Sequence, residues 1–121
     1  MTGLVDGTRP RAGAAADDGS RLERYRLHAE ICKVLTDPKR LMLIDALRPG
    51  ERSVGELAGA VGSSLANVSQ HLAVLRHAGL VETRRAGTSI HYRLSEPELM
   101  AACDIIERIV RRRLGVSVGG R

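Results

Sequence analysis

The stretch "SSLANVSQHLAVLRHAGLV", from Ser63 to Val81, decides how the rest of the chain is interpreted. Its large apolar residues Val68, Leu72 and Leu75 recur at helical spacing and predict one buried face. The positions between them hold short hydrogen-bonding side chains, where a plain surface helix usually carries Glu and Lys. We therefore expect a helix over 65–78 that packs on one face and presents the other to a partner.

A second short helix is predicted immediately before this stretch. Ser53 stands three residues before Glu56, which is the spacing of a capping box, and it opens the segment "VGELAGAV" over 54–61. Gly62 is placed to end that helix, and Ser64 to cap the next one. Two short helices joined by a turn that contains glycine predict a helix-turn-helix.

The flanking segments predict three further elements. Asp37 and Pro38 are a cap and a first-turn residue for a helix over 39–47. The alternating segments 80–85 and 89–94, joined by "AGTS", predict a β-hairpin. A last helix is expected from near Glu96-Pro97 to Leu114, with a long apolar stripe that is typical of a dimer seam.

The N-terminal part predicts one more helix and an arm. A helix from about Leu22 to Leu35 carries two apolar stripes, so we expect burial on two sides, by the domain's own core and by a second subunit. Residues 1–20 have almost no large apolar side chains, which predicts a disordered arm. The ordered domain is thus expected over 21–114, followed by a flexible tail over 115–121.

Composition limits the classes of function. The chain has 121 residues, a net charge of +5 and a pI of about 10.0, which favours nucleic acid as partner before an acidic membrane surface. Phe and Trp are absent, so a pocket lined with aromatic rings is excluded. No run of 18 apolar residues and no secretory segment is found, so we expect a cytoplasmic protein without a membrane partner, its two cysteines reduced.

Over residues 25–114 the chain resembles the ArsR/SmtB family of bacterial winged-helix repressors. The resemblance is carried by "LTDPKRLMLIDAL" and by "ERSVGELAGAVGSSLANVSQHLAVLRHAGLVETRRAGTSIHYRL", with the motifs DP-x-RL, S-x-HL-x-x-L-x-x-AGLV and R-x-G-x-x-x-x-Y-x-L in this order. It implies a mainly α fold with a β-hairpin wing (α+β), that is, a winged helix-turn-helix that forms a homodimer through its first and last helices. It also implies a repressor of double-stranded operator DNA, released by a metal ion or a reactive small molecule.

The resemblance also assigns the residues that contact DNA. Asn67 and Gln70 suit the paired hydrogen bonds that adenine offers in a major groove. His71 either reads a base or orients the helix, and the arginines either contact phosphates or form a solvated rim. Leu65 and Ala66 stand where the family often has Gln and Ser, which leaves the DNA sequence preference open. The candidate DNA-binding residues are Ser64, Asn67, Ser69, Gln70, His71, Arg76, Arg84, Arg85 and Thr88.

The family's metal sites are missing from the sequence. Where one motif has two thiolates, this chain has Ser53 and Gly55. At the family's zinc site on the last helix, the four ligand positions hold Glu96, Glu98, Ile109 and Arg112. We therefore expect neither of these sites and no cofactor.

Cys32 and Cys103 are the only cysteines, one on each helix of the expected dimer seam. They are either small buried hydrophobes or a dithiol that senses an oxidant or reactive sulfur. With His28 they form a weak candidate for a soft-metal site. The family's redox branch has its two cysteines at other positions, which are Asp45 and a residue near Arg111 here. Cys103 has no histidine nearby in sequence, so an enzyme is not expected; a helical dimerisation module is the remaining alternative class.

Overall fold

A computed structural model describes residues 14–115, and the side chains from residue 19 onward. Most of the predicted arm, residues 1–13, and most of the predicted tail, residues 116–121, lie outside the described residues. The chain divides into two compact units between Lys33 and Val34, and each is described by itself. The domain predicted over 21–114 therefore crosses this division.

The first unit holds almost all of helix α1, Ala14–Val34. The prediction that this helix begins near Leu22 is wrong, because residues 14–20, assigned to the disordered arm, are helical. The segment "AAADDGS" is rich in alanine, the strongest helix former, so the helix extends without any apolar face to bury. Leu22 and Tyr25, both from one of the two apolar stripes, are more than half exposed. The expected burial of the stripes by the domain's own core and by a second subunit stays a prediction.

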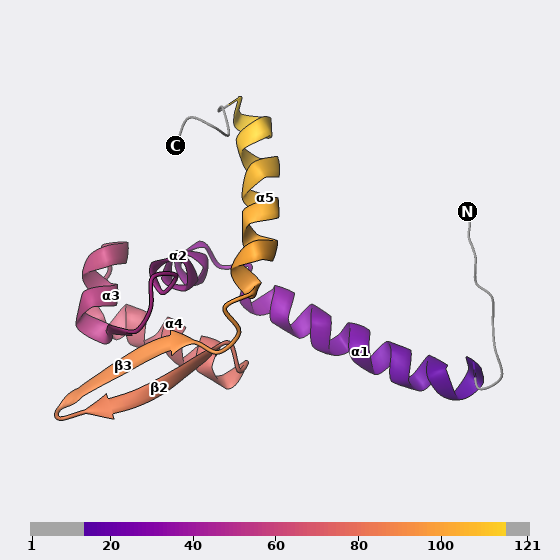
Figure 1. Ribbon diagram of the computed structural model, residues 1–121, viewed down its shortest axis with the longest axis horizontal. Coiled ribbons are helices and arrows are strands. Elements are labelled where there is room, and N and C mark those ends of the chain that lie inside the picture. Colours follow the sequence, from indigo (N-terminus) through magenta and orange to yellow (C-terminus); the bar gives the residue numbers. More distant parts are fainter. Residues whose placement is uncertain (1–13, 116–121) are drawn as a thin grey trace. The chain divides into compact units, whose positions relative to one another are not determined.

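The second unit begins with the last residue of α1 and carries the remaining elements (Figure 1). They confirm the predicted helices and hairpin, with α5 beginning at Leu99, later than the predicted Glu96-Pro97. Gly115, assigned to the tail, is the left-handed C-cap of α5. The elements are α2 (Pro38–Ala46), β1 (Arg52–Ser53), α3 (Val54–Val61), α4 (Leu65–His77), β2 (Val81–Ala86), β3 (Ser89–Leu94) and α5 (Leu99–Leu114).

Strand β1 was not predicted from the sequence, because two residues give no alternation to recognise. It pairs antiparallel with β3, with Arg52 opposite Tyr92 and Ser53 opposite His91. The sheet is therefore three-stranded in the order β1-β3-β2. It anchors the inner part of the β2–β3 hairpin to the segment that leads into α3.

The helix caps form as the sequence predicts. The Asp37 carboxylate accepts from the backbone N–H groups of Lys39, at 2.8 Å, and Arg40, at 3.3 Å. At the start of α3, the Ser53 hydroxyl accepts from the backbone N–H of Glu56 at 3.1 Å, and the Glu56 carboxylate accepts from that of Ser53 at 2.9 Å. These bonds satisfy donors that have no partner within the helix.

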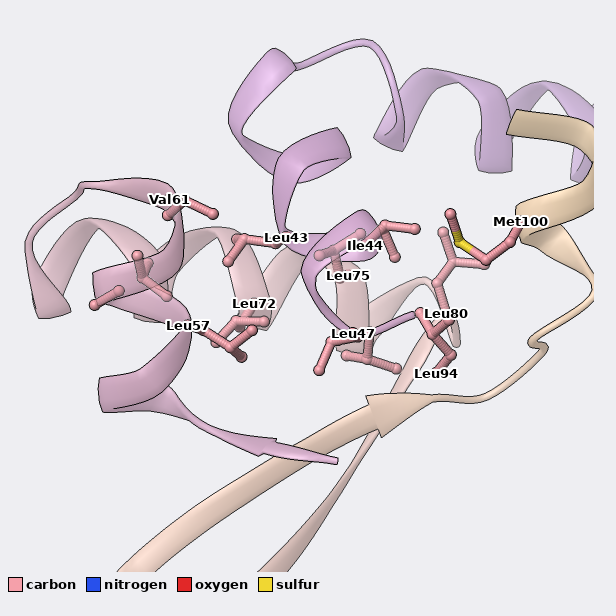
Figure 2. Close-up of a cluster of buried hydrophobic side chains, with 13 residues drawn as sticks. Leu43, Ile44, Leu47, Leu57, Val61, Leu72, Leu75, Leu80, Leu94 and Met100 are labelled. Atoms are coloured by element: carbon pink, nitrogen blue, oxygen red, sulfur yellow. The ribbon is translucent and has the colours of Figure 1, made fainter. Parts of the chain in front are cut away.

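An aliphatic core joins α2, α3, α4 and the hairpin (Figure 2). Leu43, Ile44, Leu57, Leu72 and Leu75 are completely buried. Close packing of this kind holds α4 and the hairpin in one fixed arrangement. None of the helices in the described part of the chain is both long and apolar enough to cross a membrane.

Candidate nucleic-acid interface

The α3–α4 turn fixes the start of helix α4. Gly62 ends α3 with a φ of 66°, a conformation that side chains disfavour. Ser64 then caps α4, because its hydroxyl oxygen accepts from the backbone N–H of Asn67 at 3.1 Å. The hydroxyl proton of Ser64 stays available as a donor, so the cap does not preclude a further contact.

The outward face of α4 carries mostly short side chains and no carboxylates. Val68, Leu72 and Leu75 are buried, and at about 100° per residue the opposite face centres on Gln70. Asn67 lies on one flank of that face, and all 13 residues of the helix lack Asp and Glu. The neighbouring exposed side chains are short, which lets a polyanion approach the helix backbone closely: Ala66, Ser69 and Ala73.

Asn67 and Gln70 are also the only asparagine and the only glutamine in the 121 residues. Both side chains are exposed on α4. Each carries an amide donor and an acceptor at its end, which is the pair that reads an adenine edge. Their concentration on one exposed face is a signal that the composition of the chain already carries.

His71 lies differently from the other candidates. It is half-buried, and its Nδ1 lies 3.4 Å from a guanidinium nitrogen of Arg40. The Nε of Arg40 donates to the backbone carbonyl of Val34 at 2.7 Å. These contacts favour the orienting role for His71. Arg40 was missed as a site residue, although it is the arginine of the DP-x-RL motif.

Arg76 stands exposed in the last turn of α4, beside His77. Positive side chains there are favoured by the partial negative charge of the helix C-terminus. Arg76 thus adds a cation at one end of the polar face.

The β2–β3 hairpin, called the wing below, ends in a two-residue turn of Gly87 and Thr88. Ala86 pairs with Ser89, and Gly87 has a φ of 63°. Thr88 is exposed at the tip. A tight turn keeps the wing narrow enough to follow a groove or a phosphate backbone.

Arg84 and Arg85 point to opposite faces of the wing. Side chains alternate along a strand, so Arg85 shares a face with Val81, which is buried in the core. Arg84 shares the other face with His91, its partner on β3. Arg85 is therefore on the side of the sheet that packs toward α4, and Arg84 is on the far side.

Arg84 is held by a carboxylate on that far side. Its guanidinium makes a two-pronged ion pair with Glu51, with nitrogen–oxygen distances of 2.6 and 3.0 Å. The hydrogen bond from Arg84 lowers the pKa of Glu51 and raises that of Arg84. Among residues 14–115, no ion pair involves Arg85, so the two neighbouring arginines differ in availability as well as in direction.

The two cysteines fall in different units. Cys32 is exposed on α1, whereas Cys103 on α5 is half-buried and packs against the core. Burial raises the pKa of the Cys103 thiol, an effect that the nearby Arg48 partly opposes. Residues 14–115 contain no group of three or more His, Cys, Asp and Glu side chains that suits a metal ion, and His28 is exposed on α1.

Comparison with known proteins agrees with this geometry. A profile described as bacterial regulatory protein, arsR family, matches residues 37–83. The HTH-type transcriptional regulator Rv0081 of Mycobacterium tuberculosis is 37% identical over 91 residues, which are 74% of this chain and 80% of that protein. The chain belongs to the arsR family. It is thus a winged helix-turn-helix transcriptional regulator, and its named relatives are regulators, not enzymes.

Solved structures of relatives share the fold. The crystal structure of Rv0081 matches with a TM-score of 0.66 at 37% identity, over 75% of this chain and 92% of that one. The transcriptional repressor BigR of Xylella fastidiosa matches with 0.65 at 41% identity, over 74% and 94%. A homodimeric winged helix-turn-helix DNA-binding domain from Mycobacterium bovis matches with 0.64 at 30% identity, over 89% and 92%.

Proposed function

We propose that this arsR-family protein is a homodimeric repressor that binds double-stranded operator DNA and is released by an effector acting on its cysteines. The observation that carries DNA binding is the exposed face of α4. It is free of carboxylates in a chain with 14 acidic residues, and it holds the only Asn and Gln. An α-helix with small polar side chains fits a major groove.

The contacts divide into base reading and phosphate binding. Asn67 and Gln70 read adenine edges, with Ser69 beside them. The Ser64 hydroxyl donates a hydrogen bond to a phosphate oxygen. Thr88 contacts the DNA backbone from the tip of the wing. Arg76 and Arg85 bind phosphates, whereas His71 orients the helix and Arg84 stays on Glu51.

The homodimer rests on exposed apolar side chains of α5 and of α1. Ile105, Ile106 and Leu114 of α5 are 52%, 60% and 72% exposed, and Leu22 and Tyr25 of α1 are more than half exposed. Exposed apolar faces on two helices are typical of an interface. The related Mycobacterium bovis domain is homodimeric.

DNA binding is tested by fluorescence anisotropy with a duplex that the protein selects from a random-sequence library. We expect an affinity that falls steeply with salt, because phosphate contacts release counterions. Asn67→Ala and Gln70→Ala should each weaken binding to the selected duplex by about tenfold and leave binding to a scrambled duplex nearly unchanged. Equal losses on both duplexes would contradict base reading, and a failure to select any duplex would contradict DNA binding.

For release we propose a thiol reaction between Cys32 and Cys103. The exposed Cys32 thiolate attacks hydrogen peroxide and breaks its O–O bond, which gives a sulfenic acid and hydroxide. The Cys103 sulfur then attacks the Cys32 sulfur, and water leaves as the disulfide forms. The exposure of Cys32 and the raised pKa of the Cys103 thiol support this order, because the thiolate is the nucleophile. A polysulfide gives the same disulfide: the Cys32 thiolate takes one sulfur atom from it to form a persulfide, and the Cys103 sulfur then attacks the inner sulfur and displaces hydrosulfide.

The thiol proposal is tested with Cys32→Ser and Cys103→Ser beside the parent. The parent should lose DNA affinity on treatment with peroxide or polysulfide and recover it with a dithiol reductant, with the bridge detected by mass spectrometry. Both variants should keep their DNA affinity under treatment. If they respond like the parent, the cysteines are structural. A response to soft-metal ions in chelator-treated protein, lost in His28→Ala, would instead favour the His28, Cys32 and Cys103 metal site.

A further inference from the structure

Arg48, directly after the C-cap of α2, forms an ion-paired fork that joins α2 to α5. Its guanidinium donates to both carboxylate oxygens of Asp104, at 2.8 and 3.2 Å. It also donates twice to one oxygen of Asp45, at 3.1 and 3.2 Å. Asp45 lies on α2 itself, whereas Asp104 lies on α5, 56 residues after Arg48.

The fork is placed where α5 leaves the core. Leu99, Met100 and Cys103 of α5 pack against the buried cluster. From Ile105 onward the apolar side chains of α5 are exposed, and the helix projects away from α2, α3 and α4 (Figure 1). The packed first turn is therefore a pivot, and Asp104 is the next point at which the helix is held.

We infer that Arg48 and Asp104 are positioning residues that set the angle between α5 and the DNA-reading body. The inference rests on the proposed function, in which α5 forms the dimer seam and α4 reads DNA. A two-pronged guanidinium–carboxylate pair fixes direction as well as distance, which a single charge contact does not. The hydrogen bond that Arg48 donates to Asp104 is also the largest cause of the raised pKa of Arg48.

The angle of α5 sets the distance between the two α4 helices of the proposed homodimer. Ten residues of α5 follow Asp104, a length of about 15 Å, so a tilt of about 5° moves its far end by about 1 Å. In a homodimer the change occurs twice, once in each subunit. Because half-sites on DNA are spaced by a helical turn, the angle of α5 selects which operator spacing binds best.

The test uses the full chain and the duplex that it selects from a random library, with one base pair inserted or removed between the half-sites. The parent should prefer the selected spacing by about tenfold or more. Asp104→Asn cuts the tie to α5 and should reduce this preference at least about threefold. Arg48→Lys keeps the charge but loses the fork, and it should do the same. Asp45→Asn is the matched control, because it removes a carboxylate from the same arginine without cutting the tie to α5.

Stability separates positioning from folding. All three side chains are more than 40% exposed, so the midpoint of thermal unfolding should stay within about 2 °C of the parent. The inference is overturned if Asp104→Asn retains the spacing preference, or if Asp45→Asn loses as much of it. If the parent selects no duplex, the proposed function itself is wrong. If the parent binds and every variant keeps the parent's spacing preference, only the positioning role of Arg48 and Asp104 is wrong.

Discussion

Replacing Arg85 with Ala should weaken DNA binding in a way that depends on salt, whereas removing the neighbouring Arg84 should not. Arg85 is on the core side of the wing, and no described residue pairs with it. Arg84 is on the far side and is held by Glu51. The two arginines are adjacent in sequence, so they form a matched pair for one experiment.

The expected change in salt dependence follows from the number of phosphate contacts that are lost. One phosphate contact contributes about 0.9 to the slope of log K against log salt, and a homodimer loses two contacts when Arg85 is replaced. The slope should therefore become shallower by about 1.8. The ratio of parent affinity to Arg85→Ala affinity should therefore be about 12 times smaller at 200 mM salt than at 50 mM salt.

The comparison variant is the double replacement Arg84→Ala with Glu51→Gln, which leaves the net charge of the protein unchanged. Its slope should stay within about 0.3 of the parent. The measurement is anisotropy titration of the selected duplex at four or more salt concentrations. If the double variant loses slope and Arg85→Ala does not, the assignment of the two wing faces is wrong.

Further outcomes concern the core, a cap and the orientation of α4. Leu72→Ala empties a fully buried site and should cost about 2–5 kcal/mol, which thermal denaturation would register as a fall of more than about 10 °C; exposed Ala73→Ser should change little. Burial raises the pKa of Asp37, but hydrogen bonds from the backbone N–H groups of Arg40 and Lys39 bring it below the usual 3.8. The ionised carboxylate therefore stabilises the fold above pH 3.8, and this stabilisation is lost as the pH falls through the lowered pKa. The urea midpoint of the parent should thus fall more steeply below pH 4 than that of Asp37→Asn, and parallel curves would exclude this carboxylate as the cause. Arg40→Met releases His71 and should weaken binding to the selected duplex severalfold while the salt slope stays the same; a shallower slope would mean that Arg40 itself contacts phosphate.

The elements with local sequence signals were predicted well. The Asp37 cap, the Ser53–Glu56 capping box and Gly62 each act within four residues, so their signature is complete in the sequence. The start of α1 was missed because the prediction relied on apolar periodicity, while alanine propensity alone carries those residues. Strand β1 was missed because its two residues become a strand only by pairing with β3.

The candidate site was predicted in its residues but not in its assignments. Alternation along β2 already separates Arg84 from Arg85, but the carboxylate that holds Arg84 lies 33 residues earlier, at Glu51. The same applies to His71, whose partner Arg40 is 31 residues away. Partners at such separations are set by the packing of whole elements, which local patterns do not encode.

Helix α2 connects the recognition helix to both proposed dimer helices. Near one end, Arg40 binds the last carbonyl of α1, at Val34, and contacts His71 of α4. Just beyond the other end, Arg48 binds Asp104 of α5. Between these two arginines, Leu43 and Ile44 are fully buried against the core (Figure 2). A closely packed helix moves as a unit, so a rotation imposed at Asp104 is passed through α2 to Arg40 and His71. An effector that changes the α5 end of α2 therefore acts on DNA affinity through the orientation of α4, provided that it binds the free dimer more tightly than the DNA-bound one.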